Sequence, residues 1–129
     1  MRIMNKYFIA LLLFICIGCE KDNYKKTEFF LKNSCNHSIE VKSSALVRYS
    51  DGYKEESLTD IVQYGQLLSM RKLDVSEDFT IKDVFTKIEI FKGTTKSTYD
   101  VMNKDNWVKT LTSDEKDEYT ITVDSTFFR

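Results

Sequence analysis

From Glu28 to the C-terminus, apolar and polar residues alternate with a period of two along most of the chain. This alternation is typical of β-strands that turn one face toward a core. It is clearest where Tyr119, Ile121 and Val123 alternate with polar residues, and no apolar stripe of helical period extends beyond two or three turns. We therefore expect an all-β fold, a single antiparallel β-sandwich of about seven to nine short strands.

Glycines mark the positions where we expect the strands to turn. Asp51-Gly52 lies between two strand-like segments and predicts a hairpin with a two-residue turn. Gly93 follows the strand-like residues 87–92, and we expect the second strand of that hairpin to run over residues 96–101. Two segments fit more than one structure: a helical turn or a strand at 57–64, and a short helix or an irregular loop with one strand at 102–117.

The first 18 residues show a different pattern. Arg2 and Lys6 precede an apolar run from Tyr7 to Ile17, and the small residue Gly18 follows it. A positive segment, a short apolar segment and a small residue before the cut are typical of a secretory signal peptide. The run is shorter than the roughly 20 residues that a membrane-spanning helix needs, so a permanent transmembrane anchor is the weaker alternative.

The motif Cys16-Ile17-Gly18-Cys19 resembles the lipobox of bacterial lipoproteins. The resemblance implies cleavage between Gly18 and Cys19, followed by attachment of diacylglycerol to the thiol of Cys19 and acylation of its freed amine. Two or three acyl chains, at about 0.8 kcal/mol for each buried methylene, make such an attachment effectively permanent. The lipobox usually has an aliphatic residue where this chain has Cys16, and lipidation of Cys16 itself is an alternative.

Glu20, Lys21 and Asp22 resemble the charged tract that directs lipoproteins of Bacteroidetes-type bacteria to the outer face of the outer membrane. The resemblance implies a lipid-anchored protein of the bacterial outer membrane that is exposed at the surface. A plain solvated tether, with the domain in the periplasm, is the alternative. We expect three parts in the chain: residues 1–18 as the lipoprotein signal peptide, 19–27 as the lipidated cysteine and polar tether, and 28–129 as the β-sandwich domain.

Composition limits the function of the mature chain. Removal of residues 1–18 leaves 111 of the 129 residues, which suits one domain. Because Arg2 and Lys6 leave with the signal peptide, 17 basic residues remain against 20 acidic ones, and a net charge of about −3 gives no basis for binding nucleic acid. Cys35 would be the one remaining free thiol, which excludes an intramolecular disulfide. It is then either a buried apolar residue or an exposed reactive thiol.

Few residues suggest catalysis. His37, the only histidine, lies two positions from Cys35, so on a strand the two side chains would share a face and could form a thiolate–imidazole pair. The acidic segment 114–118 offers carboxylates to a calcium ion, but it lacks the spaced ligands and the glycine of a known calcium loop. We expect a turn cysteine and a solvated loop instead, and therefore no enzyme activity, no metal site and no cofactor.

Two further features concern sugars. Asp124-Ser125-Thr126 resembles the acceptor of O-glycosylation in Bacteroidetes envelope proteins, which implies a glycan on Ser125. The chain also has nine Phe, seven Tyr and one Trp, and sugar-binding proteins stack aromatic rings on pyranose faces. Candidates for such stacking are Tyr49, Tyr53, Tyr64 and Trp107, whereas the alternative is that the aromatic side chains fill the core.

The order of the segments also resembles a wider group of proteins. A lipobox, a tether, strands around 30–41, a hairpin, a strand at 88–91 with its partner at 96–99, and a last strand at 119–123 are similar to small Bacteroidetes lipoproteins with an immunoglobulin-like or transthyretin-like sandwich and no assigned activity. The resemblance implies location and fold and carries over no catalytic residue. We expect a non-enzymatic binding or structural role with a protein or glycan partner. The alternatives are a surface glycan-binding accessory and an inhibitor of an envelope enzyme or toxin.

Overall fold

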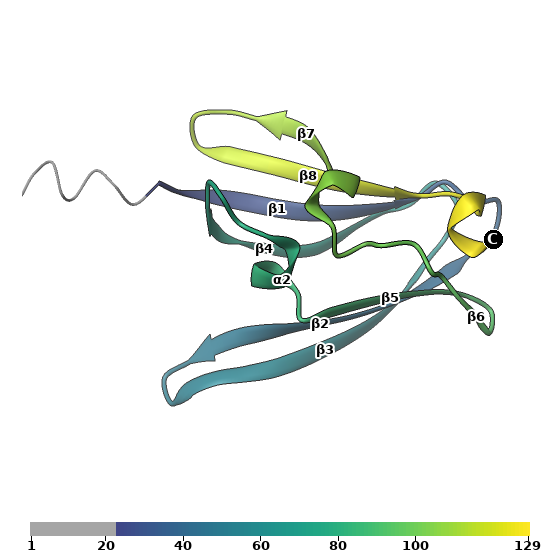
Figure 1. The fold of residues 1–129 in the computed structure, drawn as a ribbon, viewed down its shortest axis with the longest axis horizontal. Coiled ribbons are helices and arrows are strands. Elements are labelled where there is room, and N and C mark those ends of the chain that lie inside the picture. Colours follow the sequence, from purple (N-terminus) through teal and green to yellow (C-terminus); the bar gives the residue numbers. More distant parts are fainter. Residues whose placement is uncertain (1–22) are drawn as a thin grey trace, which may run out of the picture.

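The computed structural model describes residues 23–129, which form two four-stranded sheets packed face to face (Figure 1). The strand order is β4-β1-β8-β7 in one sheet, here the β1 sheet, and β3-β2-β5-β6 in the other, the β2 sheet. The eight strands confirm the predicted β-sandwich. Their bounds are β1 (Tyr24–Asn33), β2 (Ile39–Tyr49), β3 (Gly52–Val62), β4 (Leu67–Ser76), β5 (Lys87–Lys92), β6 (Thr95–Lys96), β7 (Val108–Thr112) and β8 (Lys116–Val123).

Three short helices lie in the connections: α2 (Ile81–Val84), η1 (Lys104–Asn106) and η2 (Ser125–Phe128). The helix α2 starts at a capping residue, where the backbone N–H of Thr80 donates to the Asp83 carboxylate at 2.8 Å. Its Ile81 and Val84 side chains are buried, so this single turn closes the edge of the core. Within residues 23–129, no helix has both the length and the apolar character needed to cross a membrane.

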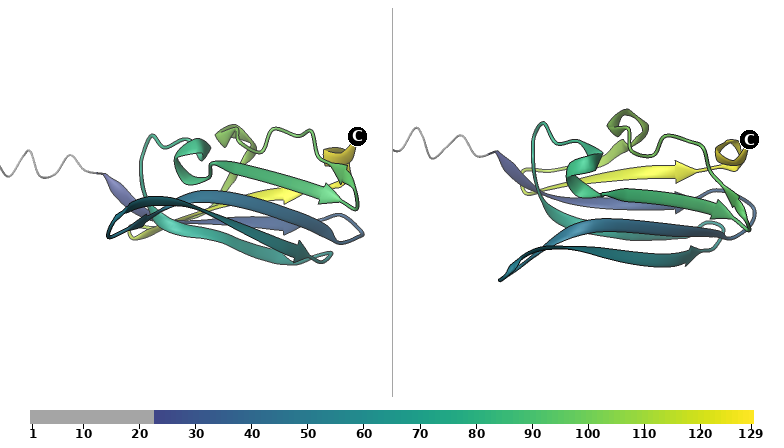
Figure 2. Two further views of the ribbon diagram at one scale, coloured as in Figure 1. Left: turned by 90° about the horizontal axis from the view of Figure 1, so that it is seen from below. Right: turned by 60° about the horizontal axis from the view of Figure 1, so that its bottom comes forward.

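The strand β1 lies inside its sheet, and its two neighbours run in opposite directions. β4 pairs with it antiparallel, whereas β8 pairs with it in parallel, from Lys26 opposite Lys116 to Asn33 opposite Val123. The prediction of a purely antiparallel sandwich is therefore wrong for this pair. Between β1 and β8 the chain crosses to the other sheet and returns, so β8 starts at the same end as β1. The C-terminus consequently lies at the end opposite to the start of β1 (Figures 1 and 2).

Alternate residues of both sheets point inward and form one core. Near its middle, Phe29 stacks on Tyr119 with 5.7 Å between ring centres and meets Phe79, Phe85 and Trp107 edge to face at 5.6 to 5.9 Å. Such aromatic pairs each add about 0.5–1.5 kcal/mol beyond the burial of their surface. The deeply buried aliphatic side chains are Leu31, Ile39, Val41, Val62, Ile81, Val84, Ile90, Ile121 and Val123.

The hairpin predicted at Asp51-Gly52 is confirmed, but its turn lies one residue earlier. Ser50 and Asp51 form the two-residue turn, and Gly52 pairs with Tyr49 as the first residue of β3. Gly52 has a φ of 123°, a backbone conformation that side-chain-bearing residues rarely adopt. Residues 57–62, for which a helical turn was the alternative, continue this strand to Val62.

Other boundaries differ from the predictions. β1 begins at Tyr24 rather than Glu28, so the end of the predicted tether belongs to the sandwich. β6 ends at Lys96, and residues 97–101 form no strand; the Ser97 hydroxyl donates to the carbonyl oxygen of Phe127 at 2.8 Å. Residues 102–117 contain η1, an irregular connection, β7 and the start of β8.

The residues of the predicted lipobox lie outside the described part of the chain. Gly18, Cys19 and the tract Glu20, Lys21 and Asp22 all precede residue 23. Signal cleavage, lipidation and the export role of the tract therefore stay predictions.

Candidate functional site

Ser125, the predicted glycosylation residue, is exposed as the first residue of η2. The Asp124 carboxylate caps this helix by accepting hydrogen bonds from the backbone N–H of Thr126 at 2.9 Å and from the Thr126 hydroxyl. Ser125 thus lies at the C-terminal end of the sandwich, far from the start of β1 (Figure 1).

In the structure the side chains of Cys35 and His37 each contact a backbone carbonyl oxygen. Cys35 is 2% exposed, and its thiol lies 3.7 Å from the carbonyl oxygen of Val123. Burial, followed by the negative charge of Asp124, raises the pKa of this thiol. The Nδ1 atom of His37 lies 3.1 Å from the carbonyl oxygen of the next residue. A buried, protonated thiol is inert as a nucleophile, so the structure decides between the two alternatives for Cys35 in favour of the buried residue.

The four aromatic candidates for sugar stacking do not share one surface. Trp107 is 5% exposed and donates its indole N–H to the carbonyl oxygen of Val101 at 2.8 Å, so it belongs to the core. Tyr49 and Tyr53 flank the β2–β3 turn, whereas Tyr64 follows β3 at the other end of that 11-residue strand. The prediction of a sugar-binding role for Trp107 is wrong, and the three exposed tyrosines form no common platform.

A cavity of about 580 Å³ opens at the end of the sandwich where β1 begins. Its walls come from the first residues of β1 and β8, the end of β4, the segment that follows β4, and the β7–β8 hairpin. These elements converge because β1 and β8 are parallel, which places both of their starts at this end. The lining residues that matter below are Tyr24, Lys25, Phe79, Lys109, Thr112, Asp117 and Tyr119.

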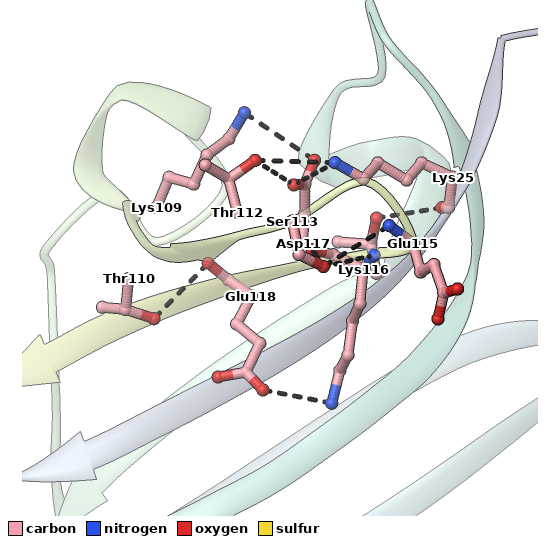
Figure 3. A network of polar contacts seen from close by, with 10 residues as sticks. Lys25, Lys109, Thr110, Thr112, Ser113, Glu115, Lys116, Asp117 and Glu118 are labelled. Atoms are coloured by element: carbon pink, nitrogen blue, oxygen red, sulfur yellow. Dashed lines mark hydrogen bonds and ion pairs between the residues drawn. The ribbon is translucent and has the colours of Figure 1, made fainter.

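Asp117 is the centre of a polar network on the cavity wall (Figure 3). Its Oδ1 atom accepts hydrogen bonds from Lys25 Nζ at 2.9 Å and from the Thr112 hydroxyl at 2.7 Å. Its Oδ2 atom lies 3.7 Å from Lys109 Nζ. Two ammonium groups therefore share one carboxylate. Each ammonium has three N–H donors, more than these contacts use, so donors remain for a bound molecule.

The charges of this network are fixed near neutral pH. Burial by itself would raise the pKa of Asp117, but hydrogen bonds from Lys25 and Thr112 and the positive charges of Lys109 and Lys25 outweigh it, and the pKa of Asp117 lies below its usual value. Interaction with Tyr119, followed by the charge of Asp117, raises the pKa of Lys109. An acid–base catalyst needs a pKa near the working pH. These groups suit the binding of a ligand better than proton transfer.

Aromatic rings form the inner wall of the cavity. The rings of Phe79 and Tyr119 meet edge to face with 5.3 Å between their centres. Lys104 Nζ lies 3.9 Å from the ring centre of Phe79, and Lys109 Nζ lies 5.5 Å from that of Tyr119. Such cation–π contacts hold the ammonium groups over the rings. The cavity thus combines an aromatic wall with a few oriented polar groups, as small-molecule sites do.

The acidic segment 114–118 is divided between a turn and β8, and the expectation of a solvated loop is wrong for its last three residues. Asp117 faces the cavity, whereas Glu118 lies 3.0 Å from Lys116 Nζ on the other face of the sheet. The same Nζ atom is 2.8 Å from the Glu28 carboxylate on β1. Over residues 23–129, His, Cys, Asp and Glu side chains form no group of three that could hold a metal ion.

The sequence pattern did not identify this cavity, although it contained one signal. Lys25 lies four positions before the core residue Phe29, and Asp117 lies two positions before Tyr119, so in a strand each shares a face with a core residue. A charged residue that shares the face of core residues at the start of a strand predicts an inward-facing polar site. The pattern could not show that the starts of β1 and β8 lie side by side, because that depends on the topology of the whole chain.

The chain matches no protein-family model, and no curated protein or solved structure is significantly similar to it. The resemblance to small Bacteroidetes lipoproteins therefore remains a prediction from the residues that carry it.

Proposed function

We propose that this chain is a Bacteroidetes-type lipoprotein, anchored through Cys19 in the outer membrane and exposed at the cell surface, whose β-sandwich has a non-enzymatic binding role. The small residue Gly18 before Cys19 and the charged tract after it support the anchor. Four residues separate Cys19 from Tyr24, the first residue of β1. Five Cα-to-Cα steps span at most about 18 Å, so the end of the sandwich that carries the cavity would lie close to the membrane.

The cavity is the observation that carries the binding role. Its volume of about 580 Å³ falls within the range of about 300–1,000 Å³ that small-molecule sites occupy. Lys25 and Lys109 supply hydrogen-bond donors, and Tyr24, 65% exposed, supplies an accessible aromatic ring, whereas the buried rings of Phe79 and Tyr119 close the inner end of the cavity. Donors beside aromatic faces favour a saccharide with acidic groups as the ligand. We therefore propose this cavity, and not the dispersed tyrosines, as the site that would bind a glycan.

The location is tested by treating intact cells with a protease that does not cross membranes and blotting for the protein. We expect digestion without lysis, because a surface-exposed sandwich is accessible. Cys19→Ala is the control for the anchor, and this variant should leave the outer-membrane fraction. Protection of the wild-type protein until lysis would contradict surface exposure and would place the domain in the periplasm.

The ligand class is tested by NMR titration of the protein with glucuronic acid and with glucose. We expect chemical-shift changes confined to the residues around Asp117 and Thr112, larger for the acidic sugar because Lys25 and Lys109 attract its carboxylate. Lys109→Ala should weaken the response to glucuronic acid, whereas Lys92→Ala, at the far end of the β2 sheet, should not. Shifts of equal size with both sugars, or none with either, would contradict an acidic saccharide.

We also propose that Ser125 carries an O-glycan. Its exposure on η2 supports accessibility to a transferase. The mass of the intact protein from its native envelope should exceed that of the lipidated chain 19–129 by one glycan, and Ser125→Ala should remove the excess. Ser113→Ala, at another exposed serine, is the matched control. A wild-type mass equal to that of the lipidated chain without a glycan would end this proposal.

A further inference from the structure

The four edge strands of the sandwich differ in how well they could accept another strand. β6 has two residues and β7 has five, and β7 is interrupted by a bulge at Thr110. β4 has a bulge at Met70. β3 runs for 11 residues with no break in its register against β2. Bulges and short lengths protect edge strands from pairing. Three edges have one or both of these features, whereas β3 has neither and is protected only by charged side chains such as Lys54 and Glu56.

The unpaired backbone groups of β3 can be assigned from their neighbours. Thr86 N–H donates to the carbonyl oxygen of Ser44 at 2.8 Å, and Arg71 donates to that of Leu46 at 2.8 Å. The even-numbered residues of β2 therefore turn their backbone groups away from β3, and the odd-numbered ones bond to it. Their partners on β3 are even-numbered. The odd-numbered residues of β3 thus point their N–H and C=O groups outward: Tyr53, Glu55, Ser57, Thr59 and Ile61.

We propose that β3 pairs with β3 of a second copy of this chain, antiparallel and across a twofold axis at Ser57. This register pairs the full length of both strands, because Ser57 is the central residue of β3. It places outward-pointing residues opposite each other, Ser57 to Ser57 and Tyr53 to Ile61, as an antiparallel ladder requires. The result is one continuous eight-stranded sheet with the order β6-β5-β2-β3-β3-β2-β5-β6.

Charge selects this register over its neighbours. Lys54 lies opposite Asp60 of the second copy, and this pair occurs twice across the axis. Glu56 lies opposite Leu58, so no two like charges face each other. Moving the axis by one residue toward Gly52 puts Glu56 opposite Glu56, and moving it the other way puts Glu56 opposite Asp60. Opposite charges stabilise cross-strand pairs and like charges destabilise them.

Exposed apolar side chains on β3 fit the same arrangement. Tyr53 is 67% exposed, Leu58 59% and Ile61 57%. An aromatic ring opposite a β-branched residue is a favourable cross-strand pair, and pairing would bring Tyr53 against Ile61 at both ends of the new ladder. The twofold axis reverses the strand direction of the second copy, so the N-terminal segments of the two copies lie at opposite ends of the dimer. Both lipid anchors can reach the same membrane when the joined sheet lies parallel to the membrane surface.

The register is tested by cysteine cross-linking of the full-length protein in its native envelope. In Ser57→Cys, the two introduced thiols face each other across the axis, where opposite Cα atoms lie about 5.5 Å apart, within disulfide range. We expect a disulfide-linked dimer on a non-reducing gel. Thr59→Cys is the matched control, because its two thiols are offset by four residues, about 14 Å along the strands. This control should remain a monomer.

The charge argument is tested in the Ser57→Cys background. Lys54→Asp and Asp60→Lys should each weaken dimerisation by about tenfold, since each creates two like-charge pairs, and the double variant should restore it. Absence of the Ser57→Cys dimer, an equal dimer with Thr59→Cys, a disulfide to a different protein, or no rescue by the double variant would each overturn the proposal.

Discussion

The two hairpins whose tips lie at the cavity end of the sandwich, β7–β8 and β2–β3, are held in different ways (Figures 1 and 2). The β7–β8 tip is fixed to β1 by charged contacts, in which Lys25 binds both Asp117 and Thr112. The β2–β3 tip extends beyond Ser44, the last β2 residue that pairs with β5. Its one ion pair, Lys54 with Asp51, is exposed at 3.4 Å.

This difference shows how one fold can carry two kinds of surface. Contacts between β7–β8 and its neighbour leave a shaped, polar wall, which is what a ligand site needs. The β2–β3 hairpin has few side contacts apart from Arg71, which donates to the Leu46 carbonyl, and Thr86, which donates to Glu55 at 2.8 Å. Its backbone groups remain available along a whole edge, which suits pairing with another strand.

The largest expected effect is on the free energy of unfolding, and it distinguishes the core next to β7–β8 from the exposed strand β3. Phe29→Ala should lower the free energy of unfolding by about 3–5 kcal/mol, because a fully buried ring is removed from among four other rings. Leu58→Ala, on exposed β3, should change it by no more than about 0.5 kcal/mol. Urea unfolding of both variants, followed by circular dichroism at a protein concentration low enough to keep the chain monomeric, measures the two losses. Equal losses of stability would show that the Leu58 side chain on β3 contributes to the core as much as Phe29 on β1 does.

Arg71 is the contact that should matter most to the β2–β3 hairpin. Its guanidinium donates to the carbonyl oxygens of Val84 and Leu46 and so links β4 to α2 and β2. Arg71→Met should cost about 1–3 kcal/mol, because both carbonyl groups lose their partner. Hydrogen exchange should accelerate in residues 46–55 and much less in β7–β8.

Arg71→Lys is the matched control, because it keeps the charge but has no planar fork to reach both carbonyls. It should show most of the loss. If Arg71→Lys behaved like the wild type, charge rather than the bridging geometry would be the stabilising factor.

The ion pairs of β7–β8 should make its stability depend on pH. Asp117 has a lowered pKa in the folded state, so its contribution is present above the unfolded pKa of about 3.9 and is lost as pH falls through the folded value. Asp117→Asn should therefore cost about 1 kcal/mol at pH 7 after screening by solvent, and less at pH 2. Thermal unfolding of both proteins at the two pH values measures this. A difference independent of pH would contradict the assignment.

The smallest effect is expected at the β2–β3 tip. Asp51→Asn removes the exposed ion pair with Lys54 but keeps a residue that suits the turn. The free energy of unfolding should change by less than about 0.5 kcal/mol at any salt concentration. A larger, salt-dependent loss would mean that this tip is held electrostatically, as the β7–β8 tip is.

Sequence alone predicted the elements of this fold better than their arrangement. Alternation predicted β8 and the hairpin at Gly52, because side-chain parity and turn chemistry are local properties. The parallel pairing of β1 with β8 joins residues about 90 positions apart, such as Lys26 and Lys116, and no local pattern encodes it. The cavity could not be predicted for the same reason, since its walls meet only through that pairing.

Single residues illustrate the same limit. Trp107 follows the polar residues 103–106 and was a candidate for a surface role, but its ring lies in the core beside Phe29 and Phe85. For Cys35 the sequence left a buried residue and an exposed thiol as alternatives, because the reason for its burial is tertiary: its thiol packs against the end of β8. Whether a loop residue is buried depends on which distant parts of the chain pack against it.

The parallel pairing of β1 and β8 also has a mechanical consequence. The anchor would hold the chain at the start of β1, and a load on the C-terminus pulls at the end of β8, so the force acts along both strands in opposite directions. The hydrogen bonds of the ladder from Lys26 to Asn33 then resist together, in shear. An antiparallel terminal pair pulled from one end would instead open one bond at a time. The topology of this sandwich therefore suits a domain that is held at one end and pulled at the other.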